Sequence, residues 1–124
     1  MNWSNRVAIV TGGASGIGAA TVREFAKEGV SVAIFDINVE WGNGVVSELT
    51  AQGYPVSFYE VDVSDDALCK STVAAVVEKY GRLDYLVNCA VSFISRGVTV
   101  TVPEWQRSLG VNVIGCSSMV QASY

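Results

Sequence analysis

The chain has 124 residues, of which 50% are hydrophobic, a net charge of −4 and no histidine. This length corresponds to about one small domain, and the sequence contains neither the apolar run of about 18 residues that a membrane helix needs nor the apolar core of a secretory signal. The absence of a Lys or Arg cluster argues against nucleic acid as a partner, and the three widely separated cysteines argue against a metal site. We therefore expect a cytoplasmic protein with reduced thiols that binds neither membrane nor metal.

Strand and helix patterns alternate along the whole chain. A continuous apolar run, of the kind found in strands buried on both faces, predicts a strand at residues 7–11. Further strands are predicted at residues 30–35, 56–61 and 85–88. Helical patterns lie between and after them, at residues 16–28, 40–52, 65–80 and from 101 onward. This alternation predicts an α/β fold: a Rossmann-like, doubly wound parallel sheet with right-handed crossovers and the strand order 3-2-1-4.

Local signals predict where the helices begin and end. Glycine directly follows the first helices, at positions 29, 53 and 81, as it commonly does at a helix C-terminus. Ser64 is predicted to cap the third helix, and Thr101 and Glu104 have the spacing of a capping box at the start of the last one. The last helical pattern continues to the end of the chain, so we expect one domain, residues 1–124, that is incomplete.

The most informative segment is residues 11–18, TGGASGIG, which joins the first strand to the first helix. Glycines leave room for phosphates beside the backbone, and the N-terminus of the following helix offers free N–H groups and a positive dipole end. Gly12, Gly16 and Gly18 give the spacing G-x-x-x-G-x-G rather than G-x-G-x-x-G, and no Lys follows Gly18 as a P-loop requires. The segment indicates dinucleotide binding, and a glycine-rich turn without a ligand is the alternative.

Further short motifs follow the glycine turn in a fixed order. With it, they resemble the short-chain dehydrogenase/reductase family over essentially the whole chain. The resemblance lies in Thr11-Gly12-x-x-x-Gly16-x-Gly18, Asp62-Val63, Leu86-Val87-Asn88-Cys89-Ala90, Glu104-Trp105 and Val111-Asn112. It implies a nicotinamide cofactor, hydride transfer to or from an alcohol or carbonyl substrate, and a cofactor turn formed by Gly12, Ser15, Gly16, Ile17 and Gly18.

Asp36, at the end of the second strand, bears on which nicotinamide cofactor is bound. A carboxylate at this position accepts both hydroxyls of the adenosine ribose and repels a 2′-phosphate. Ser15 and Ile37 occupy the places where the family tends to carry an Arg or Lys for that phosphate. We therefore predict NAD as the cofactor, with Asp36 and Ile37 at the ribose; the alternative for Asp36 is a solvated acid at a strand end.

The resemblance assigns the remaining cofactor contacts to the ends of the third and fourth strands. Asp62 would accept from the adenine amino group beside the backbone of Val63, and its alternative role is that of a helix-entry residue. Asn88 and Ala90 would line the ribose side, and Asn88 could equally tie strand ends together. Each of these assignments is a prediction from motif position alone.

Val111 and Asn112 resemble the helix motif that the family places at its active site, and Val111 is predicted as a further cofactor contact. Asn112 would be a catalytic-site residue that bends the helix and holds a water in a proton relay; the alternative is an ordinary polar residue on a helix. Two positions depart from the family pattern, because Cys89 and Val91 replace an Asn and a Gly of the strand-end motif. The β-branched Val91 is expected to crowd the ribose or nicotinamide side.

The family's reactive Tyr-x-x-x-Lys pattern does not occur in these 124 residues. Family members are about twice this length, so we expect a truncated chain. The leading hypothesis is an NAD-dependent oxidoreductase in the intact protein; a non-catalytic NAD-binding module and an inert fragment are the alternatives. The open edge of the parallel sheet and the mean hydropathy of +0.35 also predict self-association into a homo-oligomer.

Overall fold

A computed structural model describes residues 2–124, so only Met1 of the predicted domain lies outside the described residues. The predicted parallel sheet and its strand order, β3-β2-β1-β4, are confirmed. The elements are β1 (Val7–Thr11), α1 (Gly16–Lys27), β2 (Ser31–Asp36), α2 (Val39–Thr50), β3 (Val56–Glu60), α3 (Asp66–Tyr80), β4 (Tyr85–Asn88), a 3₁₀ turn η1 (Gly97–Thr99), α4 (Val102–Leu109), a π-helical segment η2 (Gly110–Gly115) and α5 (Cys116–Ser123).

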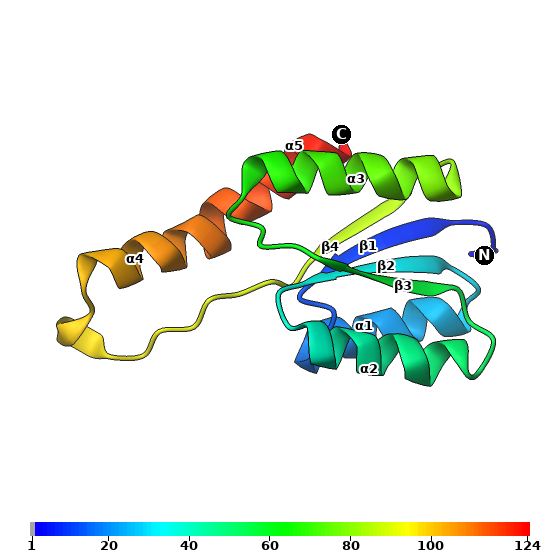
Figure 1. Ribbon diagram of the computed structural model, residues 1–124, viewed down its shortest axis with the longest axis horizontal. Helices are drawn as coiled ribbons and strands as arrows, with labels where there is room; N and C mark the ends of the chain where they lie inside the picture. Colours follow the sequence, from blue (N-terminus) through cyan, green and yellow to red (C-terminus); the bar gives the residue numbers. More distant parts are fainter. Residues whose placement is uncertain (1) are drawn as a thin grey trace.

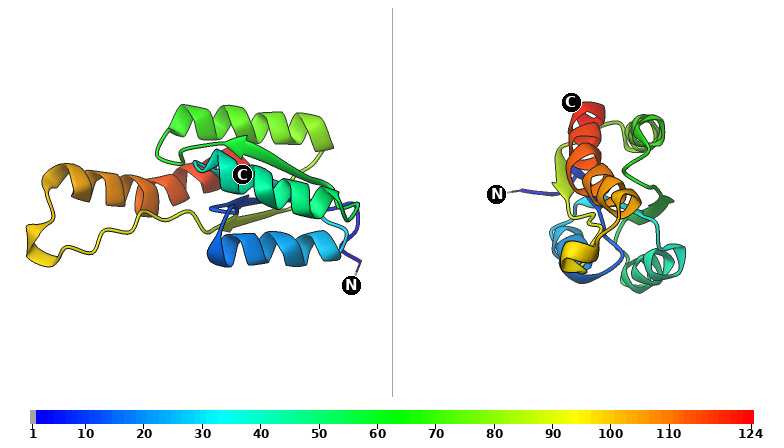
Figure 2. Two further views of the ribbon diagram at one scale, coloured as in Figure 1. Left: turned by 60° about the horizontal axis from the view of Figure 1, so that its bottom comes forward. Right: turned by 90° about the vertical axis from the view of Figure 1, so that its left-hand side faces the viewer.

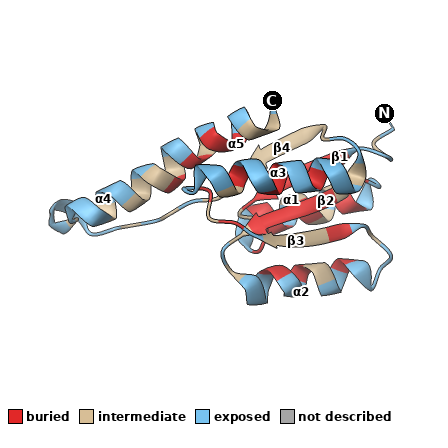
Figure 3. Ribbon diagram, turned by 45° about the horizontal axis from the view of Figure 1, so that its top comes forward, coloured by how far each residue is buried: buried red, intermediate tan, exposed pale blue. Residues whose placement is uncertain are grey.

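Helices cover both faces of the sheet. Helices α1 and α2 lie on one face, and α3 and α5 lie on the other (Figure 1; Figure 2, right). Successive residues of a strand point to opposite faces, so Ala8 and Val10 join the core under α1 and α2, whereas Ile9 joins the core under α3 and α5. Because both faces are covered, β1 and most of β2 are fully buried (Figure 3), which explains why these strands are continuous apolar runs.

The register of the parallel strands gathers their carboxyl ends at one edge of the sheet. Thr11 pairs with Phe35 on one side and with Asn88 on the other, and Asp36 pairs with Glu60. Helix α4 and the chain that leads to it extend beyond this edge (Figure 1). In open α/β sheets, ligands bind outside the carboxyl ends of the strands, so the residues that follow each strand are placed where a ligand site is expected.

One local prediction is wrong, and another lacks a detail that the structure shows. The N-cap of α3 is Asp65, whose side chain accepts from the Leu68 N–H at 3.1 Å, because the hydroxyl of Ser64 instead donates to Asp62. The last helix is also not uniform, since the π-helical segment η2 separates α4 from α5. The predicted Thr101 cap at its start is present, since its hydroxyl accepts from the Glu104 N–H. The same hydroxyl donates to the Glu104 carboxylate, in place of the backbone N–H that a capping box uses.

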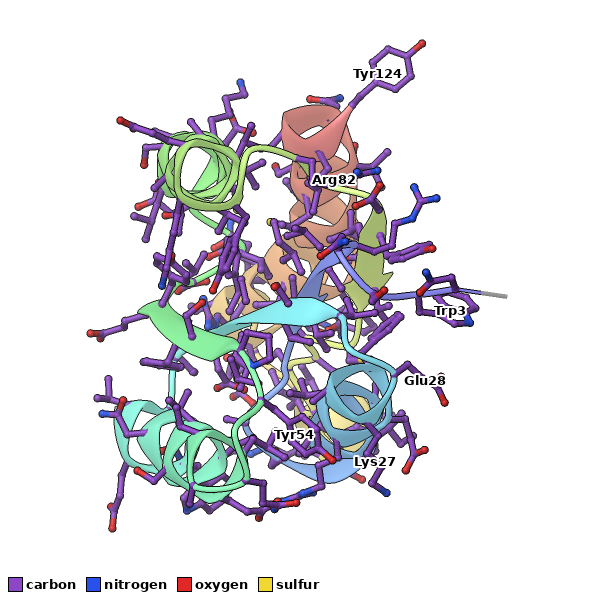
Figure 4. The ribbon with its side chains drawn as sticks, turned by 90° about the vertical axis from the view of Figure 1, so that its right-hand side faces the viewer. Trp3, Lys27, Glu28, Tyr54, Arg82 and Tyr124 are labelled. Atoms are coloured by element: carbon purple, nitrogen blue, oxygen red, sulfur yellow. The ribbon has the colours of Figure 1, made fainter. Side chains whose placement is uncertain are left out.

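Asp84, which precedes β4, ties the amino ends of two strands together. Its carboxylate accepts from the Val7 N–H at 2.9 Å and from Arg6 at 3.3 Å, and it also pairs with Arg82 at 2.7 Å. Figure 4 views this end of the molecule, opposite the carboxyl ends of the strands, and labels Arg82. The Arg82 hydrogen bond, reinforced by Val7 and Arg6, holds the pKa of Asp84 at about 2, below its usual 3.8.

Replacement of this carboxylate should make the protein less stable and less sensitive to acid. Since the pKa of Asp84 is lower in the folded chain, its stabilisation is complete above pH 4 and is lost as the pH falls towards 2. Asp84→Asn should lower the free energy of unfolding by about 1 kcal/mol at neutral pH, and the difference from the wild type should shrink at pH 2. Urea unfolding at both pH values measures this, with the exposed Glu78→Gln as control; a difference that persists at pH 2 would contradict the assignment.

Candidate functional site

A pocket of about 430 Å³ opens at the carboxyl edge of the sheet. Its walls come from the glycine turn, the ends of β2, β3 and β4, and the helical segment α4–η2. The lining residues are Gly12, Ser15, Gly16, Ile17, Gly18, Phe35, Asp36, Ile37, Asn38, Trp41, Val61, Asp62, Val63, Cys89, Ala90, Val91, Arg107 and Val111.

Most residues that the sequence predicted for a cofactor site line this one pocket. Its wall contains all the predicted glycine-turn residues and both strand-end pairs, 36–37 and 62–63. It also contains Ala90 and Val111. Asn88 and Asn112 are not among the lining residues: Asn88 ends β4 with an exposed side chain, and Asn112 lies in η2. Val91, which departs from the family pattern, is in the wall and 65% exposed. The pocket therefore groups the predicted contacts, and their roles in binding stay predictions.

The glycine turn has no space for side chains at two of its glycines. A Cβ on Gly18 would lie 2.0 Å from the carbonyl oxygen of Gly12, and a Cβ on Gly12 would lie 2.7 Å from the backbone of Cys89 and Ala90. Gly12 and Gly16 also have positive φ angles of 65° and 55°, a conformation that glycine adopts without strain. The turn is thus a cradle of bare backbone at the floor of the pocket, which fits the close approach of a pyrophosphate.

The N-terminus of α1 opens into the same pocket. Its N-cap residue Ser15 has an extended backbone (φ −153°, ψ 166°), and its side chain makes no capping hydrogen bond. The first turn of α1 contains no acidic residue, so the N–H groups of Gly16 and Ile17 keep the positive end of the helix dipole available to an anion. A cofactor phosphate would find both the space and the electrostatic partner here.

The carboxylate of Asp36 is held in a fixed orientation at the pocket wall. One oxygen, Oδ2, accepts from the Ala14 N–H at 3.1 Å, and the other, Oδ1, accepts from the Asn38 N–H at 2.9 Å. A carboxylate offers about four acceptor positions, so capacity remains on both oxygens. Asp36 can therefore accept two further hydrogen bonds, such as those from the vicinal hydroxyls of a ribose.

Asp62 is also held by hydrogen bonds, and one comes from a residue that sequence reasoning missed. Its Oδ1 accepts from the backbone N–H and the hydroxyl of Ser64, and its Oδ2 accepts from Arg107 at 2.8 Å. Burial opposes ionisation, but the bonds from Ser64 and Arg107 outweigh it and lower the pKa of Asp62. Within residues 2–124, Arg107 is the one basic side chain that lines the pocket.

Thr11 fixes the chain segment that directly follows β4. Its buried hydroxyl accepts from the N–H groups of Cys89 and Ala90, each at 3.1 Å. These bonds hold the chain after β4 against the glycine turn, so closely that a Cβ on Gly12 would lie 2.7 Å from the backbone of Cys89 and Ala90. Sequence reasoning missed the role of this hydroxyl. In the sequence, Thr11 is only the last residue of a buried strand, and no pattern indicates that its side chain bonds the chain after β4.

Asn112 connects η2 to the loop after β4. Its Oδ1 accepts from the Ser92 N–H at 2.8 Å, and its Nδ2 donates to the Ser92 carbonyl at 2.9 Å and to Ser108 at 3.2 Å. The side-chain amide thus fixes the loop that borders the pocket. Irregular π segments inside helices occur frequently at functional sites, and η2 also carries the pocket residue Val111.

Among residues 2–124, no group of three or more His, Cys, Asp or Glu side chains is arranged to hold a metal ion. No helix in the same range has both the length and the apolar character required to cross a membrane.

The strand order and the pocket at the carboxyl ends of the strands define a Rossmann-like α/β protein. A family model described as short chain dehydrogenase matches residues 6–124. The chain therefore belongs to the short-chain dehydrogenase/reductase family, whose members are oxidoreductases that bind a nicotinamide cofactor, and the resemblance found in its motifs is confirmed.

Curated relatives and solved structures agree with this membership. The chain is 40% identical over 110 residues to 2,5-dichloro-2,5-cyclohexadiene-1,4-diol dehydrogenase of Sphingobium indicum, covering 88% of this chain and 44% of that enzyme. It is 35% identical to 3-hydroxyacyl-CoA dehydrogenase type-2 of Drosophila melanogaster, covering 96% of this chain and 48% of that enzyme. A short chain dehydrogenase from Burkholderia cenocepacia in complex with NADP superposes with a TM-score of 0.93 at 32% identity, covering 99% and 51% of the two chains. The chain thus spans about half the length of these relatives.

Proposed function

We propose that the protein binds NAD in the pocket at the carboxyl edge and that the intact protein is an NAD-dependent oxidoreductase. In this proposal residues 1–124 form a single, incomplete NAD-binding domain. The observation that carries the proposal is the fixed carboxylate of Asp36, which lies in the same pocket as the bare backbone of the glycine turn. A site that pairs a pyrophosphate cradle with a ribose acceptor fits a dinucleotide better than it fits an isolated phosphate.

The charges around Asp36 support NAD rather than NADP. The pocket residues nearest to it along the chain offer no positive charge to a 2′-phosphate; they are Phe35, Ile37, Asn38 and Trp41. The basic residue of the pocket, Arg107, is already paired with Asp62. Some structural relatives were solved with NADP or NADPH, and this chain would differ from them through the negative charge that Asp36 presents.

The pocket residues would divide the work of binding and orientation. NAD, when bound, supplies the hydride acceptor, and NADH supplies the donor. The turn residues Gly12, Ser15, Gly16, Ile17 and Gly18 would hold the pyrophosphate, Asp36 and Ile37 the adenosine ribose, and Asp62 and Val63 the adenine. Ala90 and, beside the pocket, Asn88 would line the ribose side, and Val111 would be a further cofactor contact. Asn112, also outside the pocket wall, would be the active-site residue of this chain, where it fixes the Ser92 loop.

The substrate class follows from the chemistry of the family. We propose an alcohol or carbonyl compound, because the relatives are dehydrogenases of a cyclic diol and of a hydroxyacyl thioester by name. Free Cys69, Cys89 and Cys116 support a reducing, cytoplasmic location. Exposed Val102, Trp105 and Leu109 on α4 support a homo-oligomer, since apolar surface of this kind marks protein interfaces.

Titration with NADH tests the proposal, because Trp41 lies in the pocket wall. Binding should quench tryptophan emission and transfer energy to the dihydronicotinamide, and the transfer should fall in the Trp41→Phe variant. A panel of alcohols with NAD then measures turnover by the absorbance of NADH. Folded protein that shows neither quenching nor transfer would overturn the proposal, whereas binding without any turnover would support the non-catalytic NAD-binding module.

A further inference from the structure

The ion pair between Arg107 and Asp62 joins helix α4 to the end of strand β3. Nη1 of Arg107 lies 2.8 Å from Oδ2 of Asp62 and 3.1 Å from the hydroxyl oxygen of Ser64. The two ionic partners are 45 positions apart in the sequence and both line the candidate NAD pocket. The pair is therefore a tertiary contact made at the pocket itself.

Helix α4 packs little against the sheet itself, and η2 and α5 continue it along the chain. It contains no buried residue and extends away from the sheet (Figure 2, left). The ion pair between Arg96 and Glu104 links α4 only to the loop that precedes it. Over residues 2–124, Arg107 is the one α4 side chain with an ion pair to the sheet's carboxyl edge, so this contact links α4 directly to Asp62.

The hydrogen bonds that the Asp62 carboxylate already accepts determine how many more it can accept. Its Oδ1 already accepts twice from Ser64, from the N–H at 3.0 Å and from the hydroxyl at 2.6 Å. Its Oδ2 accepts once, from Arg107. Each carboxylate oxygen has about two acceptor positions, so one position remains, and it lies on the oxygen that Arg107 holds.

We propose that Arg107 is a positioning residue that fixes Oδ2 of Asp62 to accept a hydrogen bond from the adenine amino group of the cofactor. This inference rests on the proposed binding of NAD. Without the guanidinium, the carboxylate keeps only its contacts with Ser64 and is free to turn its second oxygen towards solvent. Charge-assisted bonds from Arg are short and directional, so a neutral side chain of similar length cannot replace the effect.

The proposal is tested by comparing NAD with nicotinamide hypoxanthine dinucleotide, in which a carbonyl replaces the adenine amino group. The dissociation constants of both compounds are measured by titration calorimetry. The wild type should prefer NAD by about tenfold, as expected for one hydrogen bond to a charged group. Arg107→Met and Arg107→Gln should bring the ratio close to one, and Arg107→Lys should restore part of it.

Two controls separate positioning from a general structural effect. Arg96→Met breaks the other ion pair of α4 and should leave the NAD preference unchanged. In an Asp62→Asn background, Arg107→Met should have no further effect on the preference, because the two side chains act through one contact. If folded Arg107→Met or Arg107→Gln keeps the wild-type preference for NAD over the hypoxanthine analogue, the inference about Arg107 is overturned, whereas the proposed binding of NAD is not. A wild type that binds neither dinucleotide would overturn the proposed function and the inference with it.

Discussion

Asp36→Ala should weaken NAD binding by about 10- to 100-fold, the loss expected when hydrogen bonds to a charged acceptor are removed. It should also leave NADP binding unchanged or improve it, because the substitution removes a negative charge next to the place of a 2′-phosphate. The ratio of the NAD affinity to the NADP affinity should therefore fall by at least as large a factor as the NAD affinity itself. Titration calorimetry with NAD and NADP measures both quantities on the same protein.

The control for this substitution is Glu60→Ala. Glu60 is the register partner of Asp36 on β3, it is exposed, and it does not line the pocket. Its removal changes the net charge by the same amount and should leave the NAD to NADP ratio unchanged. If Asp36→Ala keeps the wild-type ratio, or if Glu60→Ala shifts it equally, Asp36 does not recognise the ribose.

Gly18→Ala should be the most disruptive single-methyl change in the chain. The new Cβ would lie 2.0 Å from the oxygen and 2.7 Å from the carbonyl carbon of Gly12, and backbone atoms cannot move aside as a flexible side chain can. Helix α1 would have to shift away from the turn, at a cost of about 3 kcal/mol. The same shift would displace the N–H groups that are proposed to hold the pyrophosphate, so NAD binding should be lost.

The matched control is Gly44→Ala in helix α2, where a new Cβ meets no atom within 4 Å. Alanine favours a helix over glycine by about 1 kcal/mol, so this variant should be more stable than the wild type and should bind NAD equally well. Urea unfolding and NADH titration of both variants measure the contrast. Wild-type stability and affinity in Gly18→Ala would show that the turn does not have the tight geometry described above.

The sequence was sufficient to predict the fold because its signals are local and agree with one another. Continuous apolar runs such as Val7–Thr11 are typical of strands covered on both faces, and the confirmed strand order follows from strand–helix alternation. Much of the site could be predicted for a related reason. Residues at or just beyond the carboxyl ends of parallel strands, such as Asp36 and Asp62, must meet at one edge, so their position in the chain is enough to place them in one pocket.

The remaining features depend on contacts that no local pattern encodes. Arg107 reaches Asp62 across 45 positions, and no spacing rule connects a helix residue to a strand end at that distance. The cap of α3 was misassigned because Ser64 and Asp65 are both good N-cap residues, and only the tertiary structure shows that the Ser64 hydroxyl bonds Asp62. The π-helical turn at Gly110–Gly115 has no sequence signal comparable to a glycine stop.

Amide chemical-shift mapping during an NAD titration tests the central claim most directly, because it reports both whether NAD binds and where. Saturable shifts are expected for the amides of Ser15, Gly16 and Ile17 at the glycine turn and for those of Ile37 and Val63 at the strand ends. NADP at the same concentrations should produce smaller shifts at these positions. An absence of saturable shifts, or shifts confined to residues outside the pocket, would contradict the account.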